Sequence, residues 1–402
     1  MDFTREGIQW DQSYIIFHGI DVDGVLSGAL LDAHLTLHEG GSHISNSGKP
    51  QIHLVPIDIP NIPETIQSLE ERIHQTTHLA TTQPIPSSSR QLRDSNPPRA
   101  RIIFADLAFN ESLNNLEDTV KYLSTHHQLE LYDPEHRMNA SRLKPFFSTI
   151  ITPEQFPGQH ISTGSFLAKH LFPNSSLHYL ATSYLGRLCQ GADYPEESPP
   201  TIKNDSKRFQ EAIQSLSSPE SLVGYFSCKI LNWPIYELQR NRKGLPRNYL
   251  NYFWAPRFTV EVKDYRRKTR HAFTDLKRST HTFEISPGFC GAIGFAPDIL
   301  YMKPGIQSIV ETSKLPFSVC VFESGKVIFS KNEQGINPVN ALYHAIHCGD
   351  IGKLFDGGGR ETGGGGDLKR NVTPKDYPTT CYTILTTLRE HYFKPLIAQL
   401  GL

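Results

Sequence analysis

Several features that mark exported, membrane-bound or metal-thiolate proteins are missing from this 402-residue sequence. Its first residues include acidic side chains and no apolar run of signal-peptide length, and no later stretch approaches the ~18 consecutive apolar residues of a membrane-spanning helix. The six cysteines form no CxxC pair and show no Cys–His spacing typical of zinc sites. We therefore expect a cytoplasmic protein without a membrane segment, whose thiols are reduced.

The chain also has no overall excess of charge, because its formal net charge is -1. Any affinity for a polyanion must therefore come from a local patch. Residues 240–278 form such a patch, with 12 Lys or Arg against three acids. Aromatic residues are interleaved with these cations: Tyr249, Tyr252, Phe253, Trp254, Phe258, Tyr265 and Phe273. This composition predicts a groove that neutralises phosphates and stacks bases, and the alternative is a solvated basic face with aromatic side chains that anchor it to the fold.

Short apolar runs alternate with helix-length amphipathic stretches through the first 190 residues. Strands are predicted over Tyr14–Phe17, Ile52–Ile57, Arg101–Ala105 and Leu129–Tyr132, and a helix over Val25–Leu37. This order of strands and helices is typical of a mostly parallel sheet that is covered by helices.

A second α/β pattern begins near residue 281. A strand pair is predicted over Phe317–Phe322 and Lys326–Ser330, followed by a helix over Pro338–His347 and a glycine-rich run. We therefore expect an α/β protein with three parts: a mostly parallel-sheet domain over residues 1–200, a basic aromatic connecting segment over 201–280, and a smaller α/β domain over 281–402.

Acidic and imidazole side chains follow three of the predicted strands: His18, Asp21 and Asp23; Asp106; and Asp133, Glu135 and His136. A single Asp in such a place is typical of a helix cap or a turn. The carboxyl ends of parallel strands, however, meet at one edge of a sheet, so three such ends predict a cluster. Crowded carboxylates repel each other unless cations neutralise them, and this mixture of oxygen ligands and imidazoles favours Mn²⁺ or Mg²⁺ over structural zinc. Two such ions would support hydrolysis of a phosphate ester or anhydride.

The glycine-rich run, Phe355–Leu368, has seven glycines among residues 357–366. It would let backbone amides approach an anion, and Arg360 within it can bind a phosphate through two hydrogen bonds. It lacks the GK[ST] end of a Walker A loop and is not a dinucleotide fingerprint. A flexible loop is the alternative interpretation.

Together these segments resemble the DHH-family phosphoesterases, the superfamily of RecJ-like exonucleases, oligoribonucleases and cyclic-dinucleotide phosphodiesterases. HGIDVDGVLSGA, at residues 18–29, is similar to the first motif of the family, and Asp106 in IIFADL to the second. Asp133 begins the third motif, and Asp193 in LCQGADYPEE is placed like the aspartate of the fourth. GGGRETGGGGDL, at residues 357–368, is similar to the phosphate-binding signature of the partner DHHA1 domain.

The resemblance implies a centre with two Mn²⁺ ions, for which Mg²⁺ is the alternative. His18, Asp21 and Asp106 would hold one ion, while Asp23, Asp106, a third-motif histidine and Asp193 would hold the other. Asp106 would bridge the two ions, and Asp106 and Asp133 are the candidate catalytic residues. Substrate binding is assigned to these residues: Gly357, Gly358, Gly359, Arg360, Thr362, Gly363, Lys331, Arg266 and Arg267.

The sequence departs from the family pattern at two positions. The third motif is Asp133-Pro134-Glu135-His136, so a proline stands where the family has its metal-binding histidine. His136, or Glu135 after a small backbone shift, would replace that histidine, and a weakened second site is the alternative. Arg360 stands in place of a histidine, which keeps a positive charge for phosphate but removes an acid that could act near neutral pH.

Our leading hypothesis is a Mn²⁺-dependent phosphodiesterase that degrades single-stranded DNA or RNA, or short oligonucleotides, from an end. The basic aromatic segment favours a polymer. The alternatives are a hydrolase of small phosphates, such as a cyclic dinucleotide, a dinucleotide, pyrophosphate or polyphosphate, and a catalytically impaired protein that binds nucleic acid or nucleotides. The oligomeric state is left open.

Overall fold

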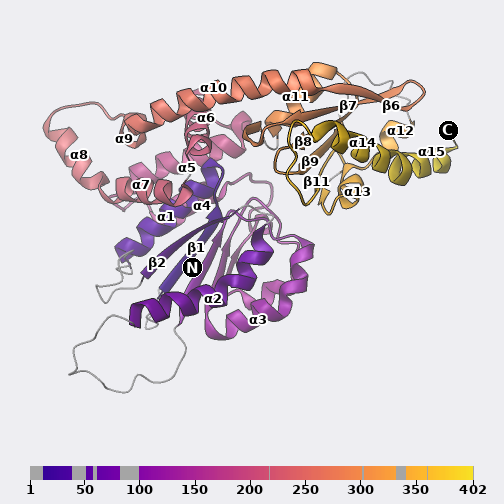
Figure 1. Ribbon diagram of the computed structural model, residues 1–402. Coiled ribbons are helices and arrows are strands. Elements are labelled where there is room, and N and C mark those ends of the chain that lie inside the picture. The colour runs from indigo at the N-terminus through magenta and orange to yellow at the C-terminus, as the bar shows by residue number, and fades with distance from the viewer. Residues whose placement is uncertain are drawn as a thin grey trace. The chain divides into compact units, whose positions relative to one another are not determined.

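The computed structural model describes residues 12–38, 51–57, 61–81, 99–216, 218–300, 303–331, 341–359 and 361–401. The chain forms two compact units, Met1–Val262 and Lys263–Leu402. The division between them falls within the long helix α10 (Pro256–Ser279) (Figure 1). The predicted division of the chain into three parts at residues 200 and 280 stays a prediction.

The described part of the first unit contains a five-stranded sheet in which all neighbouring strands are parallel. The strand order is β2-β1-β3-β4-β5, with the bounds β1 Gln12–His18, β2 Gln51–Ile57, β3 Ala100–Ala105, β4 Gln128–Tyr132 and β5 Thr149–Ile151. Every residue of β3 is buried, as expected for a central strand with helices on both faces. The predicted mostly parallel sheet is therefore confirmed, and β5 is an additional strand.

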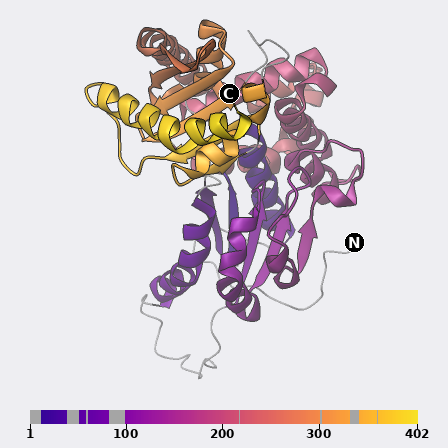
Figure 2. The same ribbon diagram turned by 90° about the vertical axis from the view of Figure 1, so that its right-hand side faces the viewer.

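Helices cover both faces of this sheet (Figure 1, Figure 2), and a hydrophobic cluster lies on each face. Along β1, Ile15 and Phe17 belong to one cluster, whereas Tyr14 and Ile16 belong to the other, because successive side chains of a strand alternate between its faces. The first cluster includes residues of α1 (Val22–His38), α4 (Thr163–Leu171), α5 (Tyr179–Asp193), α6 (Pro200–Ser215), α7 (Pro219–Leu231), α9 (Tyr249–Phe253) and the start of α10. The second includes residues of α2 (Ile62–Thr81) and α3 (Glu117–His126). The unit also contains α8 (Trp233–Arg242) and the short helices η3 (Glu111–Leu116), η4 (Ser141–Phe146), η5 (Pro153–Gln155) and η6 (Pro195–Glu197).

The aromatic side chains of the basic segment belong mainly to this core. Phe253 and Phe258 are fully buried, and Tyr249, Tyr252 and Trp254 pack against the same cluster. The expectation that these rings form a base-stacking groove was therefore wrong for Phe253 and Phe258. Aromatic side chains contribute strongly to a hydrophobic core, and the exposed Lys and Arg side chains of α10 match the alternative, a basic face anchored by aromatic residues.

The described part of the second unit contains a six-stranded mixed sheet of order β10-β11-β9-β8-β7-β6. The bounds are β6 His281–Ser286, β7 Phe289–Ala296, β8 Phe317–Phe322, β9 Lys326–Lys331, β10 Gly358–Gly359 and β11 Gly363–Asp367. The helices are η7 (Asp298–Leu300), α11 (Lys303–Ser313), α12 (Ala341–Ala345), α13 (Cys348–Lys353), α14 (Tyr377–Leu388), the π-helix η8 (Arg389–Phe393) and α15 (Lys394–Leu400). The predicted pair β8–β9 is confirmed as antiparallel. The helix predicted over Pro338–His347 is confirmed only over α12. Ile346 and His347 are not helical, and residues 338–340 lie outside the described residues.

The glycine-rich run forms two strands of this sheet. β10 pairs with β11, and β11 pairs with β9. A Cβ on Gly364 would lie 2.1 Å from the carbonyl oxygen of Cys348, so the absence of a side chain lets α13 rest directly on the strand. The flexible-loop alternative was therefore wrong for the described residues of the run. Arg360 lies outside them.

The six cysteines are all free, as the sequence analysis expected. Among the residues that the structure describes, no helix is both long enough and apolar enough to cross a membrane.

Candidate metal centre

Three neighbouring strands of the first unit end in side chains that can bind a metal. His18 is the last residue of β1, Asp106 directly follows β3, and Asp133 directly follows β4. The Nδ1 atom of His18 lies 2.7 Å from Asp21 Oδ2 and 3.8 Å from Asp106 Oδ2. Asp106 has a φ of 57°, a left-handed conformation that is unusual for a residue with a side chain. The parallel sheet thus brings the first and second motifs into contact.

The turn between β1 and α1 fixes the first-motif side chains. Asp21 Oδ1 accepts a hydrogen bond of 2.9 Å from the backbone N–H of Gly24, which is a helix-capping arrangement. A Cβ on Gly24 would lie 2.0 Å from the carbonyl oxygen of His18. Glycine is therefore required here, because the start of the helix lies directly against the end of the strand.

Asp23 is held by a helix that the sequence analysis did not connect with the site. Its two carboxylate oxygens accept hydrogen bonds from the backbone N–H groups of Thr163 (2.8 Å) and Gly164 (2.7 Å), in the first turn of α4. The N-terminus of a helix favours a negative charge because its N–H groups are unpaired and the helix dipole is positive there. No sequence pattern indicated this contact.

The third motif keeps two side chains in the cluster despite Pro134. Asp133 Oδ1 accepts hydrogen bonds from the backbone N–H of His136 (2.9 Å) and from its ring Nδ1 (3.0 Å). Glu135 belongs to one group of possible metal ligands with Asp106 and His136, and to another with Asp23 and Asp193. From the sequence, Glu135 was expected only as an alternative to His136, whereas the fold brings both residues to the cluster.

Three overlapping groups of potential ligands result, and within each group the ligand atoms lie within 4.8 Å of one another: His18, Asp21 and Asp106; Asp106, Glu135 and His136; Asp23, Glu135 and Asp193. Asp106 and Glu135 each belong to two groups. Asp133 Oδ2 and Asp193 Oδ2 are buried without a hydrogen-bond partner, which is costly for a carboxylate unless a proton or a cation satisfies it. The donor set, rich in oxygen and with two imidazoles, fits divalent cations such as Mn²⁺ and Mg²⁺.

The cluster is electrostatically strained because it buries many carboxyl groups together. Burial, followed by the charge of Asp23, raises the pKa of Asp193 to about 11. Burial is also the main cause that raises the pKa of Asp106 to about 6 and that of Glu135 to about 7. Protons therefore remain on part of the cluster near neutral pH when no cation is bound.

The pKa values of the two histidines are also raised, but hydrogen bonds to carboxylates are the cause and not burial. Burial alone would lower the pKa of His18, but hydrogen bonds with Asp106 and Asp21 raise it to about 10. Burial would likewise lower the pKa of His136, and its hydrogen bond with Asp133 raises it to about 9. Each imidazolium offsets part of the negative charge, and a cation that binds these side chains must displace their protons.

The remaining predicted substrate residues belong to the second unit, whereas the cluster lies wholly in the first. Lys331 is buried and its Nζ donates to the carbonyl oxygen of Ile346 (2.8 Å) and to Glu361 Oε1 (2.6 Å). Its backbone N–H donates to the carbonyl oxygen of Thr362 (3.0 Å). Arg266 and Arg267 are exposed on α10, and Arg267 forms an ion pair of 2.6 Å with Asp264. Gly357, Gly358, Gly359 and Gly363 lie in or beside β10 and β11.

Fold and site together define a class of protein. It is an α/β protein of two compact units, with a cluster of carboxylates and imidazoles at the carboxyl ends of parallel strands. The chain is similar to a solved DHH domain described as a member of a family of ribosomal proteins, with a TM-score of 0.53 and 12% identity over 94% of this chain and 87% of that one. The chain thus has the DHH-domain fold, as the motifs predicted.

Two further solved structures are similar at lower TM-scores. Exonuclease RecJ bound to manganese has a TM-score of 0.46 and 12% identity, over 93% of this chain and 89% of that one. An exopolyphosphatase-related protein from Bacteroides fragilis has a TM-score of 0.40 and 11% identity, over 94% and 92%. No family model matches the sequence, and no curated protein matches it.

Proposed function

We propose that this chain is a cytoplasmic, Mn²⁺-dependent phosphodiesterase that hydrolyses short oligonucleotides or single-stranded nucleic acid from an end. One observation carries the proposal: Asp106 and Glu135, which follow adjacent parallel strands, are each shared between overlapping groups of buried and half-buried potential ligands. Shared ligands are what a pair of closely spaced cations requires, and Mg²⁺ is the alternative ion.

The residues divide between two cation sites. His18, Asp21 and Asp106 would hold one ion, and Asp23, Asp106 and Asp193, with Glu135 and His136, would hold the other. Cations bound there would polarise a phosphoryl group and lower the pKa of an attacking water. The protein's own contribution is to hold the ligands rigidly before a substrate arrives.

Several contacts provide this rigidity. Asp133 accepts one hydrogen bond from the ring of His136 and one from its backbone N–H, which makes Asp133 a candidate for positioning that ring. The first turn of α4 holds both oxygens of Asp23. His18 is held between Asp21 and Asp106, so its ring has little freedom to rotate.

Substrate phosphates would be bound by cationic and backbone groups of the second unit. The exposed side chains of Arg266 and Arg267 on α10 can each neutralise a phosphate. We further propose that Gly357, Gly358, Gly359, Arg360, Thr362, Gly363 and Lys331 contribute to a phosphate-binding region. The support for a nucleic-acid substrate is therefore the positive charge of this unit. It does not come from the aromatic rings of the basic segment.

A second candidate function, hydrolysis of a small phosphate compound, is favoured by the burial of Phe253 and Phe258. Those rings belong to the basic aromatic segment, whose cations and rings together favoured a polymer, and the same cluster would serve a dinucleotide or pyrophosphate. The third hypothesis, a catalytically impaired binding protein, depended on the loss of a ligand at Pro134. The presence of Glu135 and His136 in the cluster speaks against it.

The experiment that tests the proposal is hydrolysis of 5′- and 3′-labelled single-stranded DNA and RNA, beside a cyclic dinucleotide and pyrophosphate, in Mn²⁺, Mg²⁺ or EDTA. Shortening of a labelled strand that needs Mn²⁺ and is lost in Asp106→Ala would support the exonuclease proposal. Cleavage of only the small compounds would favour the second candidate. Binding of oligonucleotide without any cleavage would favour the third.

A further inference from the structure

A pocket of about 520 Å³ opens in the first unit beside the strand end that carries His18. Its wall includes Gly19 and Ile20, which lie between His18 and Asp21 in the chain. The side chains of His18 and Asp21 meet within 2.7 Å of each other in the acidic cluster, while the two residues between them line the pocket. The same four-residue turn therefore borders both the cluster and the pocket.

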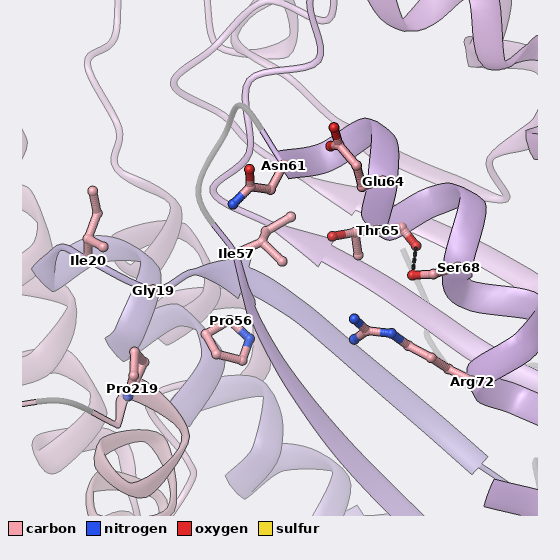
Figure 3. A pocket seen from close by; sticks show the side chains of 10 residues that line it. All are labelled: Gly19, Ile20, Pro56, Ile57, Asn61, Glu64, Thr65, Ser68, Arg72 and Pro219. Carbon is pink, nitrogen blue, oxygen red and sulfur yellow. Dashed lines mark hydrogen bonds between the residues drawn. The ribbon is translucent and has the colours of Figure 1, made fainter. Parts of the chain in front are cut away.

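One wall of the pocket is apolar. Ile20, Pro56, Ile57 and Pro219 come from the turn after β1, the end of β2 and the start of α7 (Figure 3). A Cβ on Gly19 would lie 2.9 Å from the Cβ of Pro56 and 3.4 Å from the Cγ of Pro219. Any side chain at Gly19 would thus press against Pro56, so the turn after β1 packs directly on the end of β2. The absence of a side chain lets Gly19 and Ile20 form part of the apolar wall beside Pro56, Ile57 and Pro219.

The opposite wall is polar and comes from the first half of α2 and from Asn61, which directly precedes the helix. Asn61, Thr65, Ser68 and Arg72 are spaced so that they share one face of the helix, and Figure 3 shows their side chains directed toward the end of β2. Their neighbours Ile62, Ile66, Leu69 and Ile73 form the apolar stripe that packs into the core. The polar stripe is therefore separate from the one that holds the helix in place.

We propose that this pocket binds the nucleoside part of a nucleotide whose phosphate lies at the acidic cluster, an inference that rests on the proposed function. A nucleoside has flat apolar faces and hydrogen-bonding edges, which match an apolar wall opposite hydroxyl, amide and guanidinium groups and the carboxylate of Glu64. The volume lies within the roughly 300–1,000 Å³ typical of small-molecule sites. Pyrophosphate or polyphosphate has no group that would use the apolar wall. The pocket therefore favours nucleotide esters over inorganic phosphates.

The test uses the full chain with Mn²⁺ and calorimetry. It compares the binding of adenosine 5′-monophosphate with that of methyl phosphate, which has no nucleoside. Ser68→Trp fills the pocket from its polar wall. Gln67→Trp places the same side chain at the neighbouring exposed position of α2, outside the pocket, and is the matched control. We expect Ser68→Trp to weaken binding of the nucleotide at least tenfold, with less than a twofold change for methyl phosphate. Gln67→Trp should change neither.

Equal affinity of the wild type for the two ligands, or undetectable nucleotide binding, would overturn the pocket proposal. An equal loss of affinity for both ligands in Ser68→Trp points to damaged folding. The smaller substitution Ser68→Leu is then tested by the same criterion, a loss of affinity for the nucleotide but not for methyl phosphate. The outcome is separable from that of the hydrolysis assay. If Ser68→Trp selectively loses affinity for the nucleotide while the wild type shows no hydrolysis, the pocket is supported and the proposed function is contradicted. If the wild type hydrolyses its substrate and Ser68→Trp does so equally well, the proposed function is supported and the pocket is contradicted.

Discussion

The carboxylate of Asp23 accepts a 2.7 Å hydrogen bond from the backbone N–H of Gly164, although 141 residues separate them in the chain. This contact joins the first turn of α1 to the first turn of α4, and the neighbouring amide of Thr163 binds the other oxygen. The two amides fix the orientation of the carboxylate without using a side chain. A proposed ligand that would otherwise have rotamer freedom is thereby held in one conformation.

Gly164→Ala should destabilise the fold and weaken metal binding together. A Cβ there would lie 2.4 Å from Cys189 Sγ and 2.8 Å from Asp23 Oδ1, so α4 must shift. Overpacking of this kind costs about 1–3 kcal/mol in free energy of unfolding, measurable by urea denaturation. Gly224→Ala, in α7 where a Cβ meets nothing within 4 Å, is the control and should be neutral or slightly stabilising. Equal stability of the two variants would contradict the close packing at Gly164.

Asp106→Asn should abolish hydrolysis and remove at least one bound cation. The substitution keeps the size of the side chain and removes the charge from two of the groups of potential ligands. We expect the rate to fall at least about 1,000-fold, as for removal of a group needed to stabilise the transition state. Metal stoichiometry is measured by mass spectrometry after desalting. Asp118→Asn, at an exposed acidic position of α3, should retain both metal and activity.

Glu135→Gln should weaken metal binding more than His136→Asn. Glu135 belongs to two groups of potential ligands and His136 to one, so loss of the glutamate charge affects both. We expect at least a tenfold loss of Mn²⁺ affinity in a calorimetric titration of Glu135→Gln. If His136→Asn loses the second ion while Glu135→Gln keeps two ions at unchanged affinity, then His136 alone takes the place of the family's histidine.

Metal binding should release protons and become tighter as pH rises. Burial raises the pKa of Asp106 to about 6, of Glu135 to about 7 and of Asp193 to about 11, so Mn²⁺ must displace protons near pH 7. The affinity should increase between pH 6 and pH 8. Calorimetry in two buffers of different ionisation enthalpy counts the released protons. Binding without proton release at pH 6.5 would contradict the cluster as the site.

The metal-free protein should lose stability over the same pH range. Because these carboxyl groups have pKa values above those of the unfolded chain, the folded state holds more protons, and the stability that they confer is lost as pH rises through about 6 and 7. The melting temperature in EDTA should therefore fall between pH 5 and pH 8, and Mn²⁺ should restore it. Asp106→Asn should show a smaller fall, because one of the titrating groups is gone.

Arg266→Ala combined with Arg267→Ala should weaken oligonucleotide binding in a salt-dependent way. Each phosphate contact with a single strand contributes about 0.7 to the slope of log affinity against log salt, so loss of two contacts should reduce the slope by about 1.4. Arg267 also pairs with Asp264, which makes about 1.4 an upper value. Lys203→Ala, an exposed cation of α6, is the control. An unchanged slope would mean that substrate does not contact this face of α10.

Local sequence determined the strands and the first half of the site. The apolar runs that form β1, β3, β4 and β8 are short and bounded by polar residues, which is the pattern of buried strands. His18, Asp21, Asp23 and Gly24 lie in one turn, whose geometry follows from a glycine that permits close contact and an aspartate that caps the next helix. A parallel sheet then had to bring Asp106 and Asp133 to the same edge.

Only the tertiary structure decided the rest, because it depends on contacts between distant parts of the chain. Composition could not show that Phe253 and Phe258 are buried, since an aromatic residue among cations can lie equally well on a surface or in a core. Whether Glu135 or His136 reaches the cluster depended on the path of the backbone after Pro134. The amides that hold Asp23 are presented by a helix 140 residues away, and backbone groups carry no mark in a sequence.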